Sequence, residues 1–430
     1  MLFCAFLTPL CFLCEHILSE LLMIFFILSF HNIFNGLCTV KVLGFWMISD
    51  NFSILLMMTT LWICSLMLLT MSRYQGSKKK KGVLLTIFLM TVLFSMFHTS
   101  SFIIFFFLFE LSMIPTILMI LFLGYQPERI EASLYFFFFT SIPSAGLIVY
   151  YLLSNQNMAI VYSSFHTNEL LYLMIFSVFL VKTPLYFVHF WLPKAHVEAP
   201  VAGSMILAGI LLKMGGYGMI RMLNHCYSMN MSIFFMSVSL WGMILACIMC
   251  FLSFDLKLIV AYSSVSHMNF FIASLMTAKM FVVFSGLLMM ISHAFTSSGM
   301  FFMSDLLYKR SNSRSLFINK SLISVSPSFS FWWIVFCILN MSFPMTAGNV
   351  SEIFLSLVIL KSYSLMVLIM VFFYFFFSAY YSVYIYYSIN HGFSKQMVDY
   401  SPLDLKEIFI IICHAIPCLL MYFMSFVVMT

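Results

Sequence analysis

Charged residues are scarce in this chain. Asp, Glu, Lys and Arg make up 8% of its 430 residues, whereas 63% are hydrophobic and the mean hydropathy is +1.08. A soluble globular protein has about 45–50% apolar and about 25% charged residues, so the composition excludes a soluble globule. The connections between the apolar runs are also too short to hold a soluble catalytic domain. We therefore expect one membrane domain.

The sequence also lacks the ligand patterns of iron–sulfur and zinc sites. Two of its cysteine pairs have CxxC spacing, Cys11/Cys14 and Cys247/Cys250. Both pairs lie in apolar helical runs, where cysteines three residues apart act as small buried hydrophobic groups. No set of four Cys or His residues has the spacing that these metal sites need. We expect this chain to bind no metal and no cofactor.

Glycine is rare, and its one cluster is not typical of a nucleotide-binding loop. The run Gly215-Gly216-Tyr217-Gly218 lacks the GxGxxG spacing, and no predicted strand precedes it. Close packing of helices through small side chains explains it better. The segment 189–198 contains two His and one Glu that could form a metal site, but an interfacial belt of aromatic and charged residues around a helix break is the better interpretation.

Long apolar runs are what the chain has in abundance. At about 20 residues per span, they predict an all-α polytopic membrane protein with about 14 transmembrane helices. The predicted windows are 2–14, 17–34, 52–71, 83–98, 101–123, 133–153, 169–190, 199–222, 232–252, 257–277, 281–304, 330–362 (broken), 364–389 and 408–428.

Four ionisable residues lie inside these runs, away from the predicted span ends: Glu110, Lys182, Lys213 and Glu352. A charge at mid-membrane costs about 2.5–3.5 kcal/mol even on the insertion scale, so such residues face the bundle interior and mark ion or proton paths. Asp255 and Lys279 lie near span ends, where their side chains can reach the membrane surface.

Proline interrupts two of the charged spans. Pro184 follows Lys182, and Pro344 precedes Glu352. Because a mid-helix proline removes one hydrogen bond and frees a carbonyl, both helices should open near a charge. Two such broken spans in matching halves indicate an inverted repeat with ion sites at mid-depth. We divide the chain into N-terminal helices (1–98), a first half (99–225), a second half (226–390), and a C-terminal loop with the last helix (391–430).

His267 and His293 are intramembrane histidines with three possible roles: proton relay, satisfied structural group or haem ligand. A single pair argues against haem. For proton movement, the key property of lysine is that burial lowers its pKa while a nearby carboxylate raises it. Buried acid and lysine groups on adjacent helices could thus pass a proton when water links them. The charge of arginine, by contrast, is effectively permanent.

The cations also predict an orientation. If both termini lie on one side, the loops of the opposite side hold 14 of the 20 Lys and Arg residues, Lys78–Lys81 among them. The positive-inside rule makes that side a bacterial cytoplasm or a mitochondrial matrix. The excess of Phe (53) and Met (37) over Gly (16) favours an AT-rich organellar genome. The cations separate the spans, so the net charge of +6 indicates contact with phospholipid rather than nucleic acid.

Several long strings resemble the chain 4 family of NADH:ubiquinone oxidoreductase, respiratory complex I. They are residues 109–116 and 124–129, 181–186, 191–205, 212–218, 261–268 and 292–298, and the likeness covers about residues 50–390. The resemblance implies an antiporter-like proton-translocating subunit of the mitochondrial inner membrane. Together with the distribution of the cations, this places the termini on the intermembrane-space side. The resemblance matches Glu110, Lys182, Lys213, His267, His293 and Glu352 to the family's proton relay. The chain departs from the family in its short N-terminal region, at Lys78–Lys81 and at Ser292.

The resemblance further implies that NADH, FMN, the iron–sulfur clusters and ubiquinone belong to other subunits of the enzyme. The expected partners are other membrane-arm subunits, above all neighbouring antiporter-like chains. The alternatives are a stand-alone cation/proton antiporter, which shares inverted repeats and intramembrane charges, and a haem-bearing electron carrier.

Overall fold

The structure is a computed structural model of the full chain. It describes residues 41–44, 47–72, 74–154, 169–223, 228–362, 365–392 and 401–429. The chain forms two compact units: residues 1–182 with 198–228, and residues 183–197 with 229–430. The predicted spans 2–14 and 17–34 and the pair Cys11/Cys14 lie outside the described residues.

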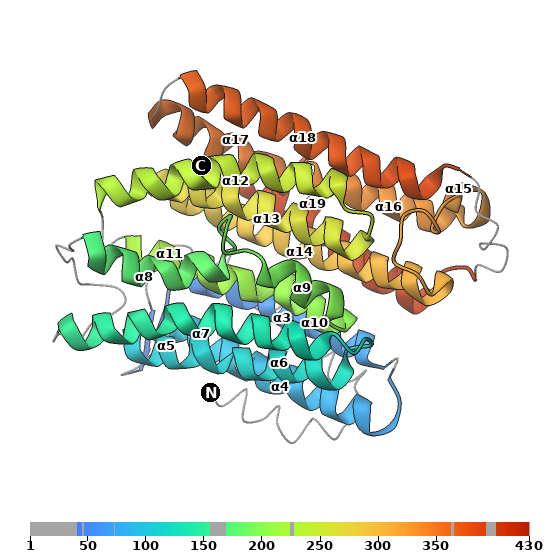
Figure 1. Ribbon diagram of the computed structural model, residues 1–430, viewed down its shortest axis with the longest axis horizontal. Coiled ribbons are helices and arrows are strands. Elements are labelled where there is room, and N and C mark those ends of the chain that lie inside the picture. Colours follow the sequence, from blue (N-terminus) through green and yellow to red (C-terminus); the bar gives the residue numbers. More distant parts are fainter. Residues whose placement is uncertain are drawn as a thin grey trace. The chain divides into compact units, whose positions relative to one another are not determined.

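Among its described residues, the first unit is helical apart from one small hairpin. Strands β1 (Lys41–Gly44) and β2 (Met47–Ser49) pair antiparallel. The helices of this unit, drawn from blue to green in Figure 1, are α3 (Asn51–Met71), α4 (Gly76–His98), α5 (Phe102–Leu111), α6 (Met113–Leu123), α7 (Arg129–Ser154), α8 (Glu169–Lys182), α10 (Val201–Ile206), the π-helix η1 (Leu207–Leu211) and α11 (Leu212–Leu223).

The second unit contains the remaining helices. They are α9 (Trp191–Glu198), α12 (Met229–Leu252), α13 (Leu256–Leu275), α14 (Met280–Ser311), α15 (Leu322–Val325), α16 (Pro327–Asn340), α17 (Ala347–Ser362), α18 (Leu365–Asn390) and α19 (Leu405–Met429). Helix α13 packs between α12 and α14, and α17 and α19 both pack on α14 (Figure 1). The central helices α13 and α14 carry His267 and His293.

The helices confirm the predicted class of a polytopic α-helical membrane protein. Within the described ranges, ten helices are long and apolar enough to cross a membrane. The predicted windows from 52–71 onward each coincide with one of these spans or with a discontinuous helix. The largest difference is at window 169–190, where α8 already ends at Lys182 because Pro184 cannot continue it.

Both proline breaks are present. The chain is non-helical from 183 to 190 and again from 341 to 346. Each break contains residues with the left-handed backbone conformation that non-glycine residues rarely adopt. These residues are Phe187 (φ 78°) in the first break, and Ser342 (φ 53°) and Met345 (φ 75°) in the second. The packing around the breaks must therefore hold these conformations against their local cost.

Asn269 of α13 satisfies backbone groups of the first break. Its Nδ2 donates to the carbonyl of Pro184 at 3.1 Å, and its Oδ1 accepts from the backbone N–H of Tyr186 at 3.1 Å. Gly242 of α12 leaves room for the backbone of the first break, because a Cβ added at residue 242 would lie 2.5 Å from Cβ of Tyr186. A fully buried amide thus satisfies two backbone groups that have no helical partner beyond the end of α8.

Gly218, the last glycine of the cluster in α11, serves the helix packing that the sequence predicted for the cluster. A Cβ added at Gly218 would overlap the ring of Phe179 on α8. The α8–α11 contact therefore depends on the missing side chain. It places Lys182 and Lys213 on two helices that pack directly against each other in the first unit.

Candidate functional site

The first group of buried charges lies at the end of α8. Lys182 is 2% exposed, and its ammonium donates to the carbonyl of Phe109 at 2.9 Å. It also lies 3.0 Å from the centre of the Phe109 ring. Glu110, the next residue of α5, is half-buried and interacts electrostatically with Lys182 and with the Ser144 hydroxyl. The carbonyl and the ring hold the lysine beside the acid.

Glu110 and Lys182 do not form a contact ion pair, because no nitrogen–oxygen distance of 4.0 Å or less joins these two described residues. A proton cannot pass directly across such a gap. Transfer between the two side chains requires a water molecule or a rotamer change. The two charges therefore interact electrostatically without forming a direct ion pair.

Lys213 lies directly after a π-helical turn. The Leu212 N–H bonds to the Leu207 carbonyl, five residues back, instead of to Ala208. The Ala208 carbonyl accepts from the Lys213 ammonium at 2.6 Å. Lys213 is 1% exposed, so the π turn supplies a polar group to a buried cation. Such turns occur often at functional sites.

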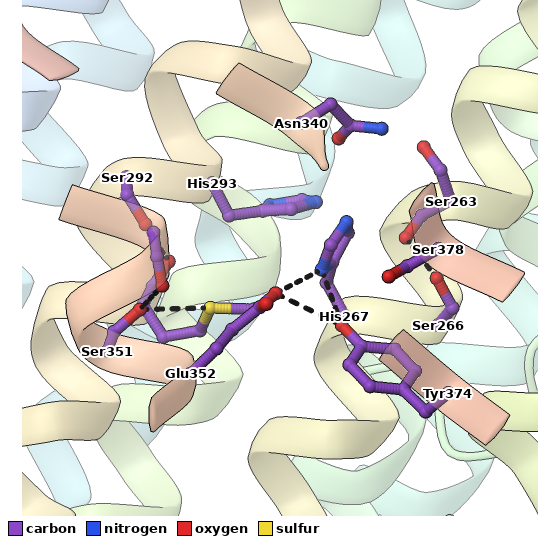
Figure 2. Close-up of polar contacts among 12 residues, drawn as sticks. Ser263, Ser266, His267, Ser292, His293, Asn340, Ser351, Glu352, Tyr374 and Ser378 are labelled. Carbon is purple, nitrogen blue, oxygen red and sulfur yellow. Dashed lines mark hydrogen bonds and ion pairs between the residues drawn. The ribbon is translucent and has the colours of Figure 1, made fainter. Parts of the chain in front are cut away.

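Glu352, His267 and Tyr374 form a second, hydrogen-bonded group in the other unit (Figure 2). Nδ1 of His267 lies 3.2 Å from Oε1 of Glu352. The Tyr374 hydroxyl lies 2.8 Å from the same Nδ1 and donates to the same Oε1 at 3.2 Å. All three side chains are buried, so a proton can move among them while bulk water is excluded.

The other ring nitrogen of His267 also has a hydroxyl partner. The Tyr381 hydroxyl lies 3.0 Å from Nε2. The Asn340 side chain, at the end of α16, donates to the Tyr381 oxygen at 3.4 Å. The hydrogen-bonded chain therefore runs from the second helix break, through two tyrosines and a histidine, to Glu352.

A small cavity lies between His267 and His293. Figure 2 shows the His293 ring turned toward His267, and their ring centres are 5.6 Å apart. Asn340, Thr296 and Ser342 also line the cavity, which leaves about 10 Å³ for the centre of a water molecule. About 10–15 Å³ with two to four polar partners is what one buried water needs. The cavity can hold a water between the histidines.

The predicted site residues therefore form separate groups. Glu110, Lys182 and Lys213 belong to the first unit, whereas His267, His293 and Glu352 lie together in the second. The segment that follows Pro184 packs within the second unit, through Asn269.

Sequence reasoning missed the tyrosines, Asn269 and the side chain of Asn340. Tyr374 and Tyr381 are seven residues apart, so both fall on the same helical face. That spacing was visible, but α18 contains many other tyrosines and phenylalanines with no such role. Asp305 of α14, which is fully buried and pairs with Lys309 at 3.3 Å, also gave no signal in the sequence.

The fold and the buried acid, lysine and histidine groups define an antiporter-like, polytopic membrane protein. Residues 99–378 match the family described as NADH:quinone oxidoreductase/Mrp antiporter, TM. The chain is 38% identical to NADH-ubiquinone oxidoreductase chain 4 of Rhipicephalus sanguineus over 381 residues, 87% of each protein. It is 36% identical to that of Ceratitis capitata, over 96% of this chain and 95% of the other. The chain belongs to this antiporter family, among its chain 4 members.

Two solved assemblies contain a chain of the same fold. One is respiratory complex I from Thermus thermophilus with bound NADH, with a TM-score of 0.82, 19% identity, and coverage of 96% of this chain and 92% of the other. The second is the archaeal membrane-bound sulfane sulfur reductase, with a TM-score of 0.82, 16% identity, and coverage of 96% and 73%. The fold thus persists where most of the sequence differs.

Proposed function

We propose that the chain is a proton-translocating membrane-arm subunit of NADH:ubiquinone oxidoreductase. The observation that carries the proposal is the buried contact of Glu352, Tyr374 and His267, in a chain whose relatives are chain 4 of that enzyme. Buried titratable groups in mutual hydrogen-bond contact are typical of proton paths in membranes. Electron transfer elsewhere in the complex supplies the energy.

In the proposed path, protons pass among Glu110, Lys182 and Lys213 in the first unit and among His293, His267 and Glu352 in the second, and water links the groups that do not touch. The two helix breaks at Pro184 and Pro344 admit this water, because their backbone groups are not bonded within a helix. Moving one charge across about 100 mV requires about 2.3 kcal/mol. A change in the electrostatic surroundings of one buried side chain alters the free energy of its charged form by a similar amount.

The same proposal covers cofactors, partners and location. This chain binds no cofactor, and NADH, FMN, iron–sulfur clusters and ubiquinone belong to other subunits. Its partners are the other membrane-arm subunits, above all antiporter-like chains, together with phospholipids. It lies in the mitochondrial inner membrane. The alternative of a stand-alone cation/proton antiporter is not favoured by relatives that carry the chain 4 name over most of this chain.

Purification of the tagged chain from membranes is expected to recover a multi-subunit complex that pumps protons when NADH and a quinone are supplied. Reconstituted alone, the chain should exchange no sodium for protons at a measurable rate. Recovery of a single chain with cation/proton exchange in liposomes would establish the alternative instead. A haem band in the visible spectrum of the isolated chain would contradict both readings.

We also propose that the α3–α4 loop and the start of α4 face the matrix. The exposed residues Lys78 and Lys80, with Lys81, lie there. Protease added to inside-out inner-membrane vesicles is expected to cleave this segment, because that treatment exposes the matrix face. Protease added to the outer face of intact mitoplasts should leave it uncut. Cleavage in the mitoplasts only would reverse the orientation.

A further inference from the structure

His267 has a phenol hydroxyl at each of its ring nitrogens. The Tyr374 hydroxyl lies 2.8 Å from Nδ1 and the Tyr381 hydroxyl 3.0 Å from Nε2. Both tyrosines are fully buried on the same face of α18. The arrangement gives the imidazole a hydroxyl contact on both sides and removes it from bulk water.

Other buried histidines in the described part of the chain are held differently. Nδ1 of His98 lies 2.9 Å from the Phe94 carbonyl, and Nδ1 of His414 lies 2.8 Å from the Ile410 carbonyl. A carbonyl only accepts hydrogen bonds, so these contacts keep the proton on Nδ1. A hydroxyl both donates and accepts. His267 therefore keeps both hydrogen bonds whether its ring is neutral or protonated.

Tyr374 also bridges His267 to the acid. Its hydroxyl donates to Oε1 of Glu352 at 3.2 Å while its oxygen is free to accept from Nδ1–H. The Tyr374 ring is stacked on Phe270, with ring centres 4.8 Å apart and planes at 13°. This packing fixes the ring, and the hydroxyl stays between the imidazole and the carboxylate.

We propose that Tyr374 carries the proton between His267 and Glu352, and that Tyr381 is a positioning residue that keeps Nε2 hydrogen-bonded in both protonation states. The inference rests on the proposed function and assigns two residues to it. The step begins with a protonated His267 and an ionised Glu352. Nδ1–H transfers its proton to the Tyr374 oxygen as the Tyr374 hydroxyl proton moves to Oε1. The opposite charges disappear together, and the remaining imidazole proton is on Nε2.

Tyr381 adjusts at the same time. While His267 is neutral with its proton on Nδ1, Tyr381 donates to Nε2 and accepts from Asn340. When Nε2 carries a proton, the same oxygen accepts from it. Tyr381 thus stabilises both states by turning one hydroxyl.

The test replaces each tyrosine by phenylalanine in the assembled complex, which retains the rings and removes only the hydroxyls. Tyr374→Phe is expected to lower NADH-driven proton pumping about tenfold or more, since a positioned proton-transfer group contributes about 10²–10⁴-fold and the direct 3.2 Å contact of Nδ1 with Oε1 remains. The solvent deuterium isotope effect on pumping should rise, because that longer transfer becomes rate-limiting. Tyr381→Phe should lower pumping by a smaller factor.

Tyr380→Phe and Tyr387→Phe are the matched controls, because both residues are exposed on the same helix, and pumping should not change in either. Rates are normalised to the amount of assembled complex. A folding defect alone would lower the yield of complex and leave the isotope effect unchanged. That outcome would reject the relay role of Tyr374. Glu352→Gln is measured in parallel. Loss in Glu352→Gln with normal pumping in Tyr374→Phe would overturn this inference alone, whereas normal pumping in Glu352→Gln would overturn the proposed function.

Discussion

Glu110→Gln and Lys182→Met are each expected to reduce NADH-driven proton pumping by about 10²-fold, and the double variant is expected to be no worse than the more severe single one. The double variant should lose little more because the two charges act through their interaction with each other, although a gap excludes direct contact. Without the carboxylate, the buried ammonium loses the charge that compensates it, and a lone buried charge is far more costly than a pair.

A double-mutant cycle on the pumping rate of the assembled complex measures this coupling. Glu169→Gln is the control, because Glu169 is exposed in the first turn of α8, the helix that ends at Lys182. Pumping in the control should equal that of the unmodified chain. If the two single losses simply multiply in the double variant, the residues act independently and the idea of a coupled pair is wrong.

Lys213→Arg is expected to abolish pumping about as completely as Lys213→Gln does. Arginine retains the positive charge but does not release its proton, so a static charge should be preserved and a relay lost. The Lys213 ammonium donates to the Ala208 carbonyl of the π turn. Proton pumping and NADH oxidation are measured on membranes with equal amounts of complex.

The matched control for Lys213→Arg is Lys279→Arg, since Lys279 is exposed at the N-terminal cap of α14. This variant should pump normally. Normal pumping in an assembled Lys213→Arg complex would show that Lys213 contributes a fixed charge, and it would remove this residue from the proposed relay.

The proline breaks illustrate what local chemistry predicts well. Pro184 and Pro344 cannot continue a helix, so the ends of α8 and α16 followed from single residues. How the freed backbone groups are satisfied did not follow. Asn269 is 85 residues from Pro184 in the chain, and nothing in the local pattern around either residue indicates their contact.

The site residues also divide into those that the sequence predicted and those that only the structure revealed. Burial cost singled out Glu110, Lys182, Lys213 and Glu352, because a charge in an apolar run is visible in any window of sequence. Tyr374 and Tyr381 were not visible, because tyrosine is common in α18 and its hydroxyl has no meaning until a partner faces it. The same holds for the π turn before Lys213, which no residue in Leu207–Leu211 requires.

The sequence by itself determined that this chain is a polytopic helical membrane protein, where most of its spans lie, where two of them break and that Glu110, Lys182, Lys213 and Glu352 lie inside apolar spans. These properties depend on hydropathy, on the proline ring and on the cost of a charge in lipid, all of which act over one or two helical turns. Only the tertiary structure decided that His267 meets Glu352 through Tyr374, and that Glu110 and Lys182 interact without touching. Hydrogen bonds act over about 3 Å, so which groups form them depends on how distant helices pack.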